Sequence, residues 1–256
     1  MEIDISNRSK RPARQIKLPT KRVGGITSDL LKLIAIIAMV IDHIAWAFVP
    51  FGTVLGQGMH VIGRLTAPIM CFMIAEGYHK TRDPKKYAGR LGLFALISHI
   101  PYIYLDTGRL PLVHETSILF PMFLGVVALI INDSPKYEQA VKNMIIILIS
   151  LLSMFGDWNF IAVWWIMAFS AAYGNRRKQI KSFCIIGAFM IIFNLIMNAM
   201  TGGWYRNLFQ LGIFLAVPLI SRYNGVRRGG KGFKWFFYIF YPAHLIVIAV
   251  LKYCVF

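Results

Sequence analysis

Ionisable side chains lie within several apolar stretches of the sequence, where a charge is costly. Seven of them are Lys32, Asp42, His43, Arg64, Glu76, His99 and His244. On insertion scales, a charge at the centre of a bilayer costs at least ~2.5–3.5 kcal/mol, so such side chains pair, contact water or carry function. Imidazole titrates near neutral pH and is the most frequent general base. The set therefore indicates acid–base chemistry together with binding of an anionic group.

The first apolar stretch presents a cation and an imidazole on one helical face. Lys32 and His43 are 11 residues apart, close to three helical turns, so they lie on the same face, ~16 Å apart along the axis. We predict that His43 is a catalytic base, with His244 as the other candidate. Asp42 points about 100° away from His43, and its depth matches that of Arg64 in the next stretch. We predict that Asp42 and Arg64 meet, as either a structural or a catalytic pair.

The last apolar stretch carries tyrosines around its histidine. Tyr238, Tyr241 and His244 recur at every third position, and Pro242 removes one helical hydrogen bond. A kinked helix with these side chains is typical of a cavity lining, although ordinary packing remains an alternative.

Three polar residues, Glu76, His60 and His79, also have simpler interpretations. Glu76 can pair with Lys80 four residues later or with His79 three residues later. We expect His60 and His79 at a membrane interface rather than in catalysis.

Long apolar runs must position these residues. The sequence of 256 residues is 57% hydrophobic and only 15% charged, with a mean hydropathy of +0.59, whereas soluble domains carry about 25% charged residues. A run of about 20 apolar residues spans a bilayer as a helix. The nine runs are 30–49, 59–78, 91–105, 113–131, 144–155, 158–173, 183–200, 208–221 and 235–253. We predict an all-α, polytopic transmembrane helix bundle of about nine spans.

The distribution of basic residues predicts the orientation of the bundle. The net charge is +17, and the Lys and Arg residues cluster between apolar runs, which favours a lipid bilayer rather than nucleic acid as partner. With a cytoplasmic N-terminus and a hairpin between the fifth and sixth runs, 23 of the 28 Lys and Arg fall inside and three outside. One long helix across both runs is the competing interpretation, and it would reverse this asymmetry downstream. We therefore predict a basic cytoplasmic tail, 1–28, a transmembrane domain, 29–256, and a C-terminus outside.

The sequence carries none of the usual soluble-enzyme motifs. Its three cysteines, Cys71, Cys184 and Cys254, lie in apolar runs without disulfide or zinc spacing. We find no phosphate-binding glycine loop, dinucleotide fingerprint or serine-hydrolase elbow. No metal is expected.

Five motifs follow one another along the chain. They are 29–43 (DLLKLIAIIAMVIDH), 63–68 (GRLTAP), 76–82 (EGYHKTR), 87–90 with 98–102 (YAGR and SHIPY), and 241–244 (YPAH). Together, in this order, they resemble the TraX family. The resemblance covers most of residues 29–250, and the basic tail is not part of it.

The resemblance implies membrane-bound acyl transfer. The family's namesake acetylates the N-terminus of conjugative pilin, and the fold is similar in style to acyltransferase-3 enzymes. It implies acetyl-CoA as donor, a peptide, pilin-like or glycan acceptor with an amine or hydroxyl, and a multi-pass location in the plasma membrane. On this basis His43, Asp42, Arg64 and His244 are assigned to catalysis, with Arg64 at the oxyanion or at an anionic group of the acceptor. The donor would be held by Lys32, Arg82, Lys85, Lys86 and Arg90, and the acceptor by Glu76, His99, Tyr238 and Tyr241.

Two other classes of function use the same buried charges. A proton-coupled transporter or flippase would use Asp42, His43 and Arg64 as a gate, although we find no inverted repeats. In a non-catalytic membrane scaffold the charges would only pair helices.

Overall fold

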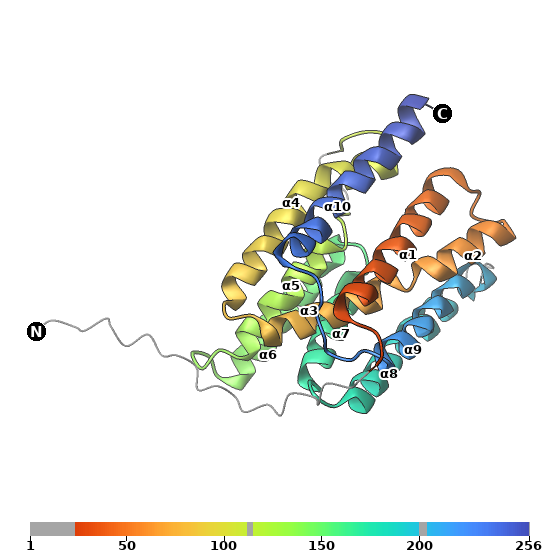
Figure 1. Cartoon of the computed structure of the whole chain (residues 1–256). Coiled ribbons are helices and arrows are strands. Elements are labelled where there is room, and N and C mark those ends of the chain that lie inside the picture. The colour runs from red at the N-terminus through yellow and green to blue at the C-terminus, as the bar shows by residue number, and fades with distance from the viewer. Residues whose placement is uncertain (1–23, 112–114, 200–203, 256) are drawn as a thin grey trace, which may run out of the picture.

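The computed structural model describes residues 24–111, 115–199 and 204–255, and within these ranges the chain is helical apart from short turns (Figure 1). Residues 1–23 of the expected basic tail lie outside the described residues. Five helical segments here are long and apolar enough to cross a membrane, namely 28–48, 54–80, 84–107, 176–199 and 235–255. The expectation of an all-helical protein is confirmed, and the five segments are those of a multi-pass membrane protein.

Each of the nine apolar runs corresponds to helical structure. The first three runs form α1 (Ser28–Phe48), α2 (Val54–Gly63) with α3 (Thr66–Lys80), and α4 (Pro84–Thr107). The next four form α5 (Leu119–Asn132), α6 (Gln139–Leu152) with the 3₁₀ turn η1 (Ser153–Phe155), α7 (Asn159–Ala171) and α8 (Arg176–Ala199). The last two form η2 (Trp204–Leu215) with α9 (Ala216–Ser221), and α10 (Lys231–Val250) with the π turn η3 (Leu251–Val255).

One end of the bundle, which we call the basic end, collects the start of α1 and the turns after α3, α5, α7 and α9. Ile26 pairs with Tyr223 as an isolated bridge, and the Asp29 carboxylate accepts hydrogen bonds from the backbone N–H groups of Arg228 and Gly229. Tyr78 at the end of α3 donates to Asp133 after α5. The segments expected on the cytoplasmic side therefore meet at one end.

At the opposite end, the end of α4 contacts the C-terminal turn η3. The Lys252 ammonium and the Tyr253 hydroxyl donate to the Leu105 carbonyl near the end of α4, and α4 and α10 lie side by side (Figure 1). Thr116 pairs with Gly156, so the turn before α5 contacts the turn between η1 and α7. Helical structure is thus interrupted between the fifth and sixth runs, from Gly156 to Trp158. That the two runs form a hairpin across the membrane stays a prediction.

The second apolar run differs from the single expected helix. It begins at Val54, earlier than predicted, and is interrupted between Gly63 and Thr66. Pro68 explains the break, because it has no N–H to bond the Arg64 carbonyl and its ring would clash with that group. The Thr66 hydroxyl instead donates to the Ala35 carbonyl of α1, which fixes the break against the middle of α1.

Aromatic side chains fill the interior, and apolar side chains also cover much of the surface. Phe72, Trp165, Phe169 and Phe183 are almost completely buried. Phe169 contacts both Phe72 and Phe183, and Phe183 also contacts Trp165. Along α8, the side chains of Ile185, Phe189, Ile192, Phe193 and Ile196 are more than half exposed. In water such a helix face would be unfavourable, whereas lipid solvates it at no cost.

Candidate active site

Asp42 lies at the centre of a buried ionic network where α1 meets the α2–α3 break. One carboxylate oxygen, Oδ2, accepts from Arg64 Nη2 at 2.8 Å, and the other, Oδ1, lies 2.8 Å from His60 Nδ1. Arg64 is 8% exposed and His60 is completely buried. The predicted meeting of Asp42 with Arg64 is present, and the structure adds His60. The expectation that His60 lies at an interface is wrong, because the extension of α2 to Val54 carries it into the protein.

Gly63 makes this network possible. A Cβ atom at this position would collide with the Asp42 side chain, so glycine lets α1 and α2 approach closely enough for the carboxylate to reach two partners. The Arg64 guanidinium is further enclosed by the rings of Trp158 and Phe209, each 5.0 Å from it. Cation–π contacts of this kind stabilise a desolvated cation.

His43, the neighbour of Asp42 on α1, contacts α10. Its Nδ1 lies 2.8 Å from Nε2 of His244, and the two rings stack with centroids 5.0 Å apart. The other nitrogen of His244, Nδ1, lies 3.0 Å from the Phe240 carbonyl oxygen. The sequence indicated both histidines as alternative bases, and the structure joins them as a pair.

The Phe240 carbonyl determines the tautomers of this pair. A carbonyl oxygen only accepts, so His244 Nδ1 carries the proton. In neutral His244, Nε2 is then an acceptor, and His43 Nδ1–H donates to it. This leaves Nε2 of His43 with a lone pair. The pair can therefore accept a proton at His43 Nε2, while His244 orients the ring and tolerates the resulting charge.

A small chamber adjoins His43. It has a volume of about 20 Å³, and its lining includes Asp42, His43, Asp157, Trp158 and Tyr241. Asp157 sits in the turn before α7, where Trp158 has a left-handed backbone, φ 67°. Burial raises the pKa of Asp157 to about 6, and the nearby Arg64 opposes this rise.

A much larger cavity opens from the basic end. Its volume is about 580 Å³, within the range of small-molecule sites. Its lining contains six basic side chains, Lys32, Lys80, Arg82, Lys86, Arg90 and Arg227, against two acidic ones, Glu76 and Asp83. Such a surplus of positive charge suits a ligand with several phosphates.

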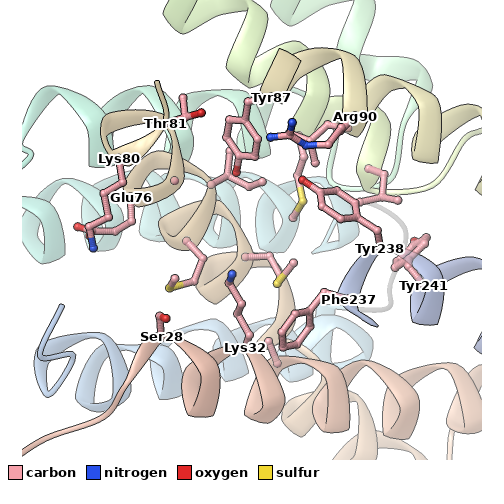
Figure 2. Close-up of a pocket in the computed structure, with 18 of the residues that line it drawn as sticks. Ser28, Lys32, Glu76, Lys80, Thr81, Tyr87, Arg90, Phe237, Tyr238 and Tyr241 are labelled. Carbon is pink, nitrogen blue, oxygen red and sulfur yellow. The ribbon is translucent and has the colours of Figure 1, made fainter. Parts of the chain in front are cut away.

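Figure 2 shows how the side chains of this cavity are arranged. Arg90 lies between Tyr87 and Tyr238, and its guanidinium is 5.9 Å from the Tyr87 ring. Lys32 extends from α1 beside Phe237, with Nζ 5.3 Å from the ring. Glu76 is buried and pairs with Lys80 at 2.8 Å, so the expected i,i+4 pair is present.

The two cavities adjoin each other. Met39, Thr66, Ile118 and Tyr241 line both. A ligand that enters at the basic end therefore reaches these four side chains at the border of the chamber that His43 lines.

Most of the residues assigned from the sequence line one of these two cavities. Two do not. Lys85 is exposed at the start of α4, and His99 is half-buried further along α4, outside the linings of both. His79, expected at an interface, contacts Ser170 and stacks on Tyr173 near the basic end. Among the described residues, no group of His, Cys, Asp and Glu is arranged to hold a metal ion.

These features define the class of protein. It is a multi-helix membrane protein with a buried Asp–Arg pair, two histidines in contact and a basic cavity. The chain matches the family described as TraX protein over residues 27–252 and belongs to that family. A curated protein of Dichelobacter nodosus, named probable fimbrial assembly protein FimC of serogroup H1, is 28% identical over 230 residues, covering 87% of this chain and 94% of that protein.

A second relative and the solved structures add less. An uncharacterised protein of Rickettsia prowazekii (strain Madrid E) is 36% identical over 97 residues, which is 38% of this chain and 34% of that protein. No solved structure matches the chain. The TraX family is associated with pilin acetylation.

Proposed function

We propose that the protein is an integral membrane acetyltransferase that moves an acetyl group from cytosolic acetyl-CoA to an amine or hydroxyl of a peptide, pilin-like or glycan acceptor. One observation carries the proposal: a basic cavity of about 580 Å³ opens at one end of the bundle and adjoins a small chamber lined by His43, whose contact with His244 leaves a lone pair on His43 Nε2. The family's link to pilin acetylation and the fimbrial name of a relative support the choice of acceptor.

The orientation in this proposal follows from charge. The basic end faces the cytosol of a cell whose plasma membrane contains the protein, because Lys and Arg are retained on that side. Arg82, Lys86 and Arg90 then bind the donor phosphates, and Lys32 lies along the path of the pantetheine arm. Lys85 lies at the entrance, where it attracts the anionic donor by charge alone.

His43 acts as the general base. Its Nε2 removes a proton from the acceptor amine or hydroxyl while the acceptor nitrogen or oxygen bonds to the thioester carbon. The C–S bond then breaks, the thiolate of CoA leaves, and His43 transfers the proton that it took from the acceptor to this thiolate. His244 is a positioning residue that holds His43 in the required tautomer.

Arg64 takes a different role from the one expected at the oxyanion. Its guanidinium already bonds Asp42 and is covered by two aromatic rings, and it does not line the chamber. We assign Asp42, Arg64 and His60 to holding α1 against the α2–α3 break, which keeps His43 at the chamber. Tyr241, which lines both cavities, is the better candidate to contact the thioester.

The test is transfer of labelled acetyl groups in membranes. Vesicles containing the wild type, the His43→Ala variant or the His79→Gln variant are incubated with radiolabelled acetyl-CoA and the acceptor-containing cell extract. Loss of a general base reduces the rate by about 10²–10⁴, so His43→Ala should incorporate almost no label although it inserts normally. His79→Gln, a histidine substitution outside both cavities, should retain the wild-type rate.

Two outcomes would contradict the proposal. Incorporation by His43→Ala at the wild-type rate would remove His43 from the mechanism. Movement of a solute across liposomes by the purified protein, with no consumption of acetyl-CoA, would instead identify a transporter.

A further inference from the structure

The small chamber beside His43 is unusually restrictive for a site that must accept a reacting group. Its free volume is about 20 Å³, and a pocket needs roughly 10–15 Å³ of such volume to hold a single water molecule. The chamber therefore has space for about one methyl-sized group. The adjoining cavity of about 580 Å³ has no such limit.

The walls of the chamber have little freedom to move. Met39 and Ile118, the apolar side chains at the boundary, are 7% and 6% exposed. On the other side, Asp42 is held by Arg64 and His60, and it fills the space that a side chain at Gly63 would occupy. Packed interiors of this kind accept an added methylene only with strain.

The direction of donor entry determines which chemical group meets these walls. In the proposed function, on which this inference rests, the phosphates remain at the basic end and the thioester advances towards His43. The acyl chain is the end of the donor farthest from the phosphates. It is therefore the part that must pass Met39 and Ile118 and occupy the chamber.

We propose that this chamber limits the length of the acyl group that the protein accepts. Ile118 and Met39 are the specificity-determining residues, which admit acetyl and exclude longer acyl chains. Ile118 is the stronger determinant, because it is the N-cap residue of α5 and its carbonyl accepts the N–H of Met122 at 3.1 Å. Its backbone is thus fixed, whereas an unbranched methionine adapts its shape more easily.

Discrimination by such a wall has a known scale. One methylene in a hydrophobic pocket changes selectivity by about 10–200-fold. A butyryl group, two methylenes longer than acetyl, should therefore be disfavoured at least ~10-fold in donor binding. Truncation of Ile118 to alanine removes three carbon atoms from the wall and should abolish most of this preference.

Donor binding tests the inference without knowledge of the acceptor. The full chain is reconstituted in lipid nanodiscs, and the dissociation constants of acetyl-CoA and butyryl-CoA are measured by titration calorimetry. We expect the wild type to bind acetyl-CoA at least ~10-fold more tightly and the Ile118→Ala variant to bind the two donors within about threefold. The matched control is Ile161→Ala on α7, where the side chain is 5% exposed and lines neither cavity, and it should keep the wild-type ratio.

The outcomes separate this inference from the proposed function. Equal binding of the two donors by the wild type, or an unchanged preference in Ile118→Ala, would overturn the chamber as the determinant while the donor site stands. Binding of neither donor by the wild type would overturn the proposed function itself. If Ile118→Ala does not fold, Ile118→Val, which removes one methyl group, should reduce the preference by a smaller factor, and an unchanged ratio there would overturn the inference.

Discussion

The Phe240 carbonyl, which takes no part in the proposed chemistry, decides where the protons of the histidine pair reside. Because it fixes the proton on His244 Nδ1, the lone pair is left on Nε2 of His43. The same two histidines with the opposite tautomers would make His244 the base. A single backbone contact therefore distinguishes two mechanisms that the sequence leaves open.

Substitutions at His244 test this assignment. In His244→Gln, the side-chain oxygen still accepts from His43 Nδ1, whereas His244→Ala leaves that N–H without its partner. We expect His244→Gln to keep most of the acetyl-transfer rate and His244→Ala to lose about 10-fold or more, the scale on which a charge-assisted hydrogen bond stabilises a transition state. Initial rates with labelled acetyl-CoA, measured across pH, provide the comparison. A fully inactive His244→Gln, together with a mildly impaired His43→Ala, would reverse the roles.

For individual residues, the sequence predicted only how deep each one lies along its apolar run. Asp42 and Arg64 could be matched because their positions along two apolar runs place them at the same level. His60 could not be included, since its direction depends on where α2 begins and where the helix breaks. His43 and His244 are 201 positions apart in the sequence. Helical spacing relates only residues of the same helix, so it could not predict this contact.

The α2–α3 break is the element that assembles the ionic network. It places Arg64 at the C-terminal end of α2, with His60 one turn earlier, and both face Asp42. The sequence contains the cause, Pro68, but the same proline is compatible with a kinked continuous helix. Only packing against α1, through the Thr66–Ala35 hydrogen bond, selects the break that is observed.

Two glycines of α2 test the importance of this close approach. Gly63→Ala would force the Asp42 side chain away from Arg64 and His60, so we expect a lower apparent melting temperature and strongly reduced acetyl transfer. Gly58→Ala is the matched control, because a Cβ atom there meets no atom within 4 Å and alanine favours helix over glycine by about 1 kcal/mol. Thermal unfolding in detergent and labelled-acetyl rates give the two readouts. Equal behaviour of the two variants would show that the Gly63 contact is dispensable.

At the scale of the whole molecule, the ends of the bundle differ in charge. The basic end gathers the α3–α4, α7–α8 and α9–α10 turns, and most of the Lys and Arg side chains that the structure describes lie in or beside these turns. The large cavity opens at this end. The sequence predicted this asymmetry because basic residues are concentrated in every second loop. The positive-inside rule concerns such short loops and needs no tertiary contact. The size and position of the cavity depend on side-chain packing between α1, α3, α4 and α10, which periodicity does not reveal.

The orientation of the bundle depends on the hairpin between α6 and α7. If both helices cross the membrane, Arg109 near the end of α4 and Lys178 at the start of α8 lie on opposite sides. Both side chains are exposed, so each can be replaced by cysteine in a background in which Cys71, Cys184 and Cys254 are alanine. A membrane-impermeant maleimide should label the Arg109→Cys variant in intact cells and the Lys178→Cys variant only after permeabilisation. Labelling of both variants in intact cells would mean that residues 139–171 cross the membrane only once. The basic cluster around Lys178 would then lie outside, against the positive-inside rule. That rule is what orients the donor cavity towards cytosolic acetyl-CoA.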